Sequence, residues 1–133
     1  MANKKDEKTE NEMYDQHIVD ALLKLKTPII GINGRKYYLR EKSHDGTGVI
    51  HIALKRHRLK VRDIESVPSI LMKPKYVSED PNHPIYRNYY GIRKGEEKNA
   101  FIKIVTSPVK GKRNEEEIIV TIYPVDRIKV DKF

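Results

Sequence analysis

Two histidines lie close together in the segment 47–57, which reads Thr-Gly-Val-Ile-His-Ile-Ala-Leu-Lys-Arg-His. Imidazole titrates near neutral pH, so His51 and His57 are candidates to take or give a proton. In a helix, His57 shares its face with three apolar side chains, those of Ile50, Ala53 and Leu54. His51 then points elsewhere, with the basic side chains of Lys55 and Arg58. His57 is therefore either a hydrogen-bonded core residue or an acid–base group at the edge of a cleft, and the spacing leaves both open.

Metal-free RNA cleavage is the chemistry that such residues could perform. It needs a base for the 2′-hydroxyl, an acid for the leaving 5′-oxygen, and cations or hydroxyl donors for the phosphorane. Because RNA supplies its own nucleophile, no activated serine or cysteine is required. The chain contains no cysteine, which removes thiol catalysis, disulfides and Cys-ligated zinc.

Other chemistries find less support in the sequence. The histidines at positions 17, 44, 51, 57 and 83 show no metal-binding spacing. Gly46-Thr47-Gly48 lacks the pattern of a phosphate-binding loop, and no serine lies in a nucleophile elbow. We therefore expect neither a metal nor another cofactor.

The charge of the chain favours a polyanionic partner such as RNA. Lys and Arg number 27 against 19 Asp and Glu, which gives a net charge of +8 and a pI near 9.6. The alternative is a domain that simply carries excess lysine. No apolar run is long enough for a membrane span or a signal peptide, so we expect no membrane association and a cytoplasmic location.

The 133 residues predict one domain, from about residue 13 to 133, behind a disordered polar tail at 1–12. Apolar spacing predicts a helix at 13–25, the helix that contains the two histidines, and a second helical unit after Arg58 that Pro68 divides. Asn33-Gly34 predicts a β-hairpin between 29–32 and 35–40. Further strands are expected at 76–77, 85–92, 100–106 and 117–123.

These elements predict an α+β fold with N-terminal helices and the hairpin packed against a C-terminal antiparallel meander sheet of about four strands. In the last strand, Ile118, Val120 and Ile122 are expected to face the helices. Ile119, Thr121 and Tyr123 would then face away and, with Lys103 on the neighbouring strand, form a polar, cationic surface.

The order of the short motifs resembles the phage and mobile-element branch of the barnase–EndoU–colicin–RelE-like (BECR) nuclease superfamily. The motifs are the hairpin, His-Ile-x-x-Lys-Arg-His, Leu-Met-Lys-Pro, Asn-Tyr-Tyr-Gly, Ile-Lys-Ile-Val and Ile-Val-Thr-Ile-Tyr-Pro, between about Ile29 and Lys129. The resemblance implies helices followed by a four-stranded antiparallel sheet. It also implies a metal-independent, toxin-like ribonuclease, with an immunity or antitoxin protein as a further partner.

The resemblance carries catalytic positions over onto His51, Arg56, His57, Thr121 and Tyr123, and more loosely onto Lys103. His57 would be the general base on the 2′-hydroxyl, and Tyr123 or His51 would serve the leaving oxygen, although base and acid can be exchanged. Arg56, Lys103 and Thr121 would stabilise the phosphorane. Five further residues are expected to contact RNA: Lys55, Arg58, Arg87, Tyr89 and Tyr90. The competing hypothesis is a phage or mobile-element module that binds nucleic acid or protein without cleaving it.

Overall fold

The structure is a computed structural model that describes residues 14–40, 48–79, 85–112 and 115–128. The predicted polar tail at 1–12 and the histidines at 44 and 83 lie outside the described residues.

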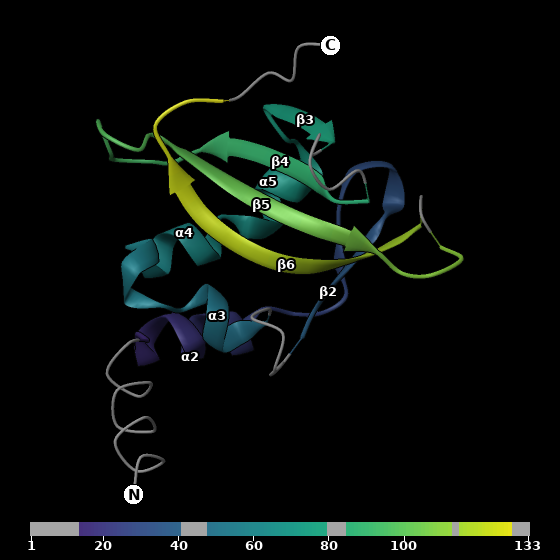
Figure 1. The fold of residues 1–133 in the computed structure, drawn as a ribbon, viewed down its shortest axis with the longest axis horizontal. Coiled ribbons are helices and arrows are strands. Elements are labelled where there is room, and N and C mark those ends of the chain that lie inside the picture. The colour runs from purple at the N-terminus through teal and green to yellow at the C-terminus, as the bar shows by residue number, and fades with distance from the viewer. Residues whose placement is uncertain (1–13, 41–47, 80–84, 113–114, 129–133) are drawn as a thin grey trace, which may run out of the picture.

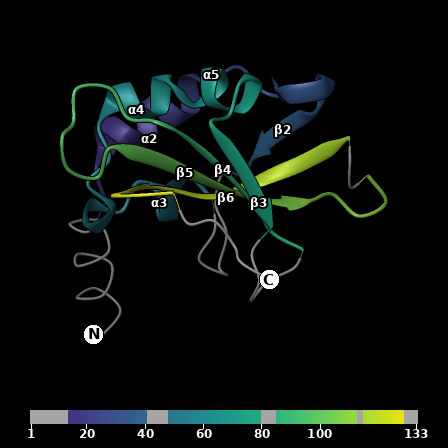
Figure 2. The same ribbon diagram turned by 90° about the horizontal axis from the view of Figure 1, so that it is seen from above.

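The fold is α+β, as predicted, and is organised around a six-stranded sheet with the order β1-β2-β6-β5-β4-β3. The strands are β1 (Ile29–Ile30), β2 (Lys36–Leu39), β3 (Tyr76–Glu79), β4 (Arg87–Ile92), β5 (Phe101–Pro108) and β6 (Glu116–Val125). The α-helices are α2 (Gln16–Lys24), α3 (Val49–Ile52), α4 (Val61–Glu65) and α5 (Val67–Met72), and the 3-10 turns are η1 (Ile32–Gly34) and η2 (Lys55–His57). Figure 2 shows α2, α4 and α5 on one face of the sheet; we call the opposite face the far face.

The predictions that depend on local signals are confirmed. Helix α2 begins after Asp15, whose carboxylate accepts a hydrogen bond from the backbone N–H of His17. The hairpin turns where predicted, with φ of 58° at Asn33 and 76° at Gly34. Pro68 lies in the first turn of α5, where its missing N–H costs no hydrogen bond, so the second helical unit is two short helices.

The prediction of a four-stranded antiparallel meander is wrong. β3, β4, β5 and β6 do pair antiparallel in chain order, but the hairpin belongs to the same sheet. β2 pairs with β6 in parallel, with Tyr37 opposite Glu117 and Leu39 opposite Ile119. Local turn signals define the hairpin but not its distant partner, and this pairing joins segments about 80 residues apart.

The predicted continuous helix through the two histidines is also wrong. α3 ends after Ile52, and Leu54 is extended, with φ −54° and ψ 133°. Leu54 forms an isolated antiparallel bridge with Tyr14, and the chain then makes the 3-10 turn η2. The bridge to the start of the domain, which the helical spacing could not reveal, replaces one helical turn.

A β-bulge makes the predicted faces of β6 wrong before Val120, although they are right after it. The register opposite β5 shifts so that Val105 faces Thr121 while the next residue, Thr106, faces Ile119. The period of two is therefore interrupted at Val120. Ile119 and Ile122 are both fully buried in the core beneath the helices, whereas Ile118 is only partly buried. The bulge leaves Thr121 and Tyr123 on the far face, as predicted, but moves Ile119 to the core.

A buried carboxylate joins four strands at one end of the core. Glu117 of β6 is 1% exposed and accepts hydrogen bonds from Tyr89 Oη at 2.9 Å and Thr106 Oγ1 at 2.5 Å. Arg87 Nη1 lies 2.8 Å from the same carboxylate. Tyr37 Oη of β2 donates to Tyr89 Oη at 3.0 Å. Burial, then the bond with Tyr89, raises the pKa of Tyr37, so this hydroxyl remains a donor.

Glu117→Gln should reduce the free energy of unfolding by about 3 to 5 kcal/mol, because the arginine keeps its charge in a buried site that has lost its counter-charge. Glu96 provides the matched control, since it pairs with Lys60 and Arg62 at the surface. Glu96→Gln should cost far less, because exposed ion pairs contribute little to stability. Urea unfolding followed by circular dichroism measures both, and equal losses would contradict the central position of Glu117.

Candidate active site

The break at Leu54 brings the two histidines into contact. Residues six apart in an unbroken helix point in different directions, which is why His51 was predicted to face away from His57. Here the rings of His51 and His57 meet edge to face, with centroids 5.3 Å apart and an interplanar angle of 79°. α3 also contacts β6, which places the pair beside the sheet (Figure 1).

His57 is held by the backbone at one ring nitrogen. Its Nδ1 lies 3.1 Å from the carbonyl oxygen of Ile52. A carbonyl can only accept, so Nδ1 carries a proton and Nε2 is left to exchange one. The ring is half-buried and stands 6.2 Å from the ring of Tyr123, centroid to centroid. His57 thus lies at the edge of the core and in contact with the far face.

His51 is tuned toward its neutral form. Burial lowers its pKa from the ordinary value, and the nearby charges of His57 and Arg56 lower it further. A histidine with a lowered pKa is largely neutral at pH 7, and a neutral imidazole accepts a proton. The pair therefore combines one ring kept ready to accept a proton with a second ring of fixed orientation.

A lysine lies between two tyrosine rings next to this pair. Lys103 is opposite Tyr90 on β4 and opposite Tyr123 on β6. Its Nζ stands 5.9 Å from the centroid of Tyr90 and 5.3 Å from that of Tyr123, within the range of a cation–π interaction. Tyr123 thus contacts His57 on one side and Lys103 on the other.

Lys103, Tyr90 and Tyr123 also line a cavity of about 330 Å³ at this end of the far face. The lining residues are Tyr90, Asn99, Lys103, Tyr123, Pro124, Val125, Asp126 and Arg127. The cavity joins two tyrosines to a lysine and an arginine, a combination suited to an aromatic ring that carries an anionic group. His57 does not line it, but reaches it through Tyr123.

Three polar atoms on the far face are buried and have no hydrogen-bond partner among the residues that the structure describes: Ser78 Oγ, Asn88 Oδ1 and Thr121 Oγ1. They belong to one row across the sheet, since Ser78 is opposite Asn88, Asn88 opposite Val105, and Val105 opposite Thr121. A buried polar group without a partner costs free energy, so such groups often mark functional surfaces. This row is offset by two residues along each strand from a second row, which Tyr90, Lys103 and Tyr123 form.

The structure brings together four of the six predicted catalytic residues: His51, His57, Tyr123 and Lys103. Arg56 is exposed on η2 and acts on His51 through its charge. Thr121 shares the far face, but its oxygen is buried and it does not line the cavity.

The predicted RNA-contacting residues divide into two groups. Lys55 and Arg58 are exposed at the two ends of η2. Tyr89 is fully buried, and Arg87 pairs with the buried Glu117, so both serve the core and leave the set of RNA contacts. Tyr90 is 2% exposed. On the far face it contacts Lys103 and lines the cavity.

The sequence analysis missed three polar lining residues, Asn99, Asp126 and Arg127. Asn99 has φ 50°, and Asp126 and Arg127 follow the end of β6. All three lie in connecting segments, where neither helical nor strand spacing applies. A positive φ favours asparagine over most other residues, but this was the only local signal.

The described ranges contain neither a candidate metal site nor a helix that could span a membrane. No three His, Asp or Glu side chains there gather closely enough to hold a metal ion. Among the described helices, none has the length and apolar character needed to cross a bilayer.

The His51 imidazole should titrate below about 6.5, the ordinary value for histidine. Arg56→Gln removes a positive charge that opposes protonation, so the pKa of His51 should rise, most clearly at low salt. NMR titration of the imidazole signals measures both values. Lys110→Gln, at an exposed position in the turn after β5, should leave the titration unchanged. A His51 pKa at or above the ordinary value would contradict the proposed tuning.

Comparison with known proteins gives no relative to set beside this site. No protein-family model, no curated protein and no solved structure matches the chain. The resemblance to BECR nucleases rests on the order of the sequence motifs alone, and function must be argued from the geometry of the site.

Proposed function

We propose that the protein is a metal-independent endoribonuclease that cleaves RNA by attack of the 2′-hydroxyl on the adjacent phosphate. The observation that carries this proposal is the contact between His51 and His57, with Tyr123 and Lys103 next to His57. Two imidazoles can supply the base and the acid that transesterification requires. The net charge of +8 supports a polyanionic substrate.

The electrostatics of the pair favour exchanging the roles first assigned to the histidines. His51, whose pKa is lowered, would accept the proton of the 2′-hydroxyl. His57, with Nδ1 held by the carbonyl of Ile52, would give a proton from Nε2 to the leaving 5′-oxygen. The 2′-oxygen forms its bond to phosphorus as the bond from phosphorus to the 5′-oxygen breaks. The products are a 2′,3′-cyclic phosphate and a free 5′-hydroxyl.

The charge that develops on the phosphorane would be met by cations on both sides of the histidines. Arg56 lies on η2 near His51, and Lys103 lies on the sheet between the rings of Tyr90 and Tyr123. Tyr123, whose ring lies beside both His57 and Lys103, would add a hydroxyl donor. Thr121 has no direct role in this scheme, because its oxygen is buried.

A binding module without catalysis is the second candidate, and the far face favours it specifically. The partly exposed ring of Tyr123 is suited to stacking on a base of single-stranded RNA, and Lys103 and Arg127, which line the same cavity, are suited to phosphate contact. Such a surface could hold RNA whether or not the histidines transfer protons. The two candidates differ in the product they leave.

The test is incubation of end-labelled single-stranded RNA with the protein in EDTA, with mass spectrometry of the products. We expect fragments with 2′,3′-cyclic phosphate ends, and no cleavage of the matching DNA, which lacks the 2′-hydroxyl. His51→Ala and His57→Ala should each lower the rate by about 10² to 10⁴, while RNA affinity changes by less than about threefold. His17→Ala is the matched control, because His17 is exposed on α2 and belongs neither to the contacting pair nor to the cavity beside Tyr123.

Intact RNA together with salt-sensitive binding would reject the nuclease and support the binding module. Cleavage that is equally fast in both histidine variants would reject the assigned residues.

A further inference from the structure

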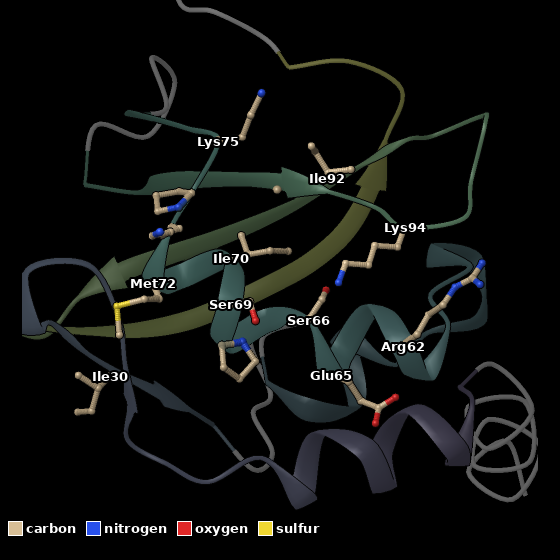
Figure 3. Close-up of a pocket in the computed structure, with 14 residues that line it drawn as sticks. Ile30, Arg62, Glu65, Ser66, Ser69, Ile70, Met72, Lys75, Ile92 and Lys94 are labelled. Atoms are coloured by element: carbon tan, nitrogen blue, oxygen red, sulfur yellow. The ribbon is translucent and has the colours of Figure 1, made fainter.

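A second concave surface lies on the helix-bearing side of the molecule, and nothing in the proposed chemistry uses it. This groove, of about 1090 Å³, runs over α5 between β1 and the end of β4 (Figure 3). None of its lining residues belongs to the histidine pair or to the cavity beside Tyr123. It therefore offers a separate binding surface.

The floor of the groove is aliphatic and exposed. Ile30, Met72 and Ile92 line it and are 48%, 49% and 57% exposed. Figure 3 shows Ile30 and Met72 at one end and Ile92 across from them, with Ile70 between. Large apolar side chains gathered in one concavity, rather than scattered singly, mark an interaction surface.

The floor is also preformed, because α5 packs directly against β4. A Cβ at Gly91 would lie 2.3 Å from Ile70 Cγ1, so only glycine permits this approach. This packing also fixes the position of Ile92, the next residue in the chain, within the groove.

The rim of the groove is cationic. Lys73, Lys75 and Lys94 line it, and all three are exposed without a carboxylate partner among the described residues. Arg62 lies at the same rim but pairs with Glu96. Glu65 is the one carboxylate among the lining residues, so the rim carries an excess of positive charge.

We propose that this groove docks an acidic, amphipathic segment of a partner protein. The aliphatic floor would take the apolar side chains of the segment, and the three lysines would select its carboxylates. RNA fits this surface less well, since none of the described residues that line the groove is aromatic and could stack on a base. The inference does not depend on the proposed nuclease activity, because the two sites share no residue.

The test is fluorescence anisotropy with a labelled synthetic peptide that carries leucine on one helical face and glutamate on the other. A peptide of the same composition in scrambled order, and one with lysine in place of glutamate, are the controls. We expect the acidic amphipathic peptide to bind with a Kd below about 1 mM and the two controls to bind at least about tenfold more weakly.

Matched protein variants locate the binding. Ile92→Asp should raise the Kd about tenfold, since it removes apolar contact and adds a repelling charge. Leu23→Asp, at a residue on α2 that is 60% exposed and outside the groove, should leave the Kd unchanged. Lys94→Glu should weaken binding by about threefold or more, and Lys110→Glu should not. Circular dichroism checks that each variant is folded.

The proposal is overturned if the acidic peptide fails to bind at about 1 mM, or if the scrambled peptide binds equally well. It is also overturned if Ile92→Asp and Leu23→Asp have the same effect. Displacement of the peptide by single-stranded RNA, lost in Lys94→Glu, would assign the groove to nucleic acid instead.

Discussion

The rest of the sheet depends on the hydrogen bonds and ion pairs of the Glu117 carboxylate. It is almost completely buried, so its charge must be balanced and its oxygens must accept hydrogen bonds within the protein. Its strand partners come from β4 and β5, Arg35 adds a longer ion pair just before β2, and through Tyr89 it is joined to Tyr37 on β2. One side chain thus links β6 to β5 and β4 on one side and to the parallel strand β2 on the other.

The bulge in β6 comes shortly after Glu117 in the chain, and it determines which side chains of β6 lie on the far face. Thr106 bonds to Glu117 on the core side, and the register shifts between Val105 and Thr106. Beyond the shift, Ile122 returns to the core while Tyr123 pairs with Lys103 on the far face. The site at Tyr123 is therefore a consequence of the arrangement that places Glu117 in the core.

Local chemistry made part of this fold predictable. Asn33-Gly34 and Pro68 each restrict only a few neighbouring backbone dihedrals, and their effects appear where the sequence predicts them. The parallel pairing of β2 with β6, the bulge, and the extended residue Leu54 depend on partners far away in the chain. Spacing within one segment contains no information about such partners.

The candidate site was predictable to the same limited degree. Residue type identified both histidines as chemically capable, and the family resemblance added Tyr123 and, more loosely, Lys103. Helical spacing, however, separated the two imidazole rings that the break at Leu54 brings together. Tyr89 and Tyr90 are adjacent in sequence and looked equivalent, yet alternation along β4 sends the first to Glu117 and the second to Lys103. Which face of a strand is buried was decided by the whole sheet.

In the proposed reaction, His51 takes the proton of the 2′-hydroxyl and His57 gives a proton to the leaving 5′-oxygen of the same phosphodiester. The most direct measurement is the pH dependence of kcat/KM for RNA cleavage in EDTA, in the wild type and in each histidine-to-alanine variant. A base and an acid acting together produce a bell-shaped profile. The residual activity should lose its acidic limb when His51 is replaced and its alkaline limb when His57 is replaced. A bell that persists unchanged in either variant would contradict the claim.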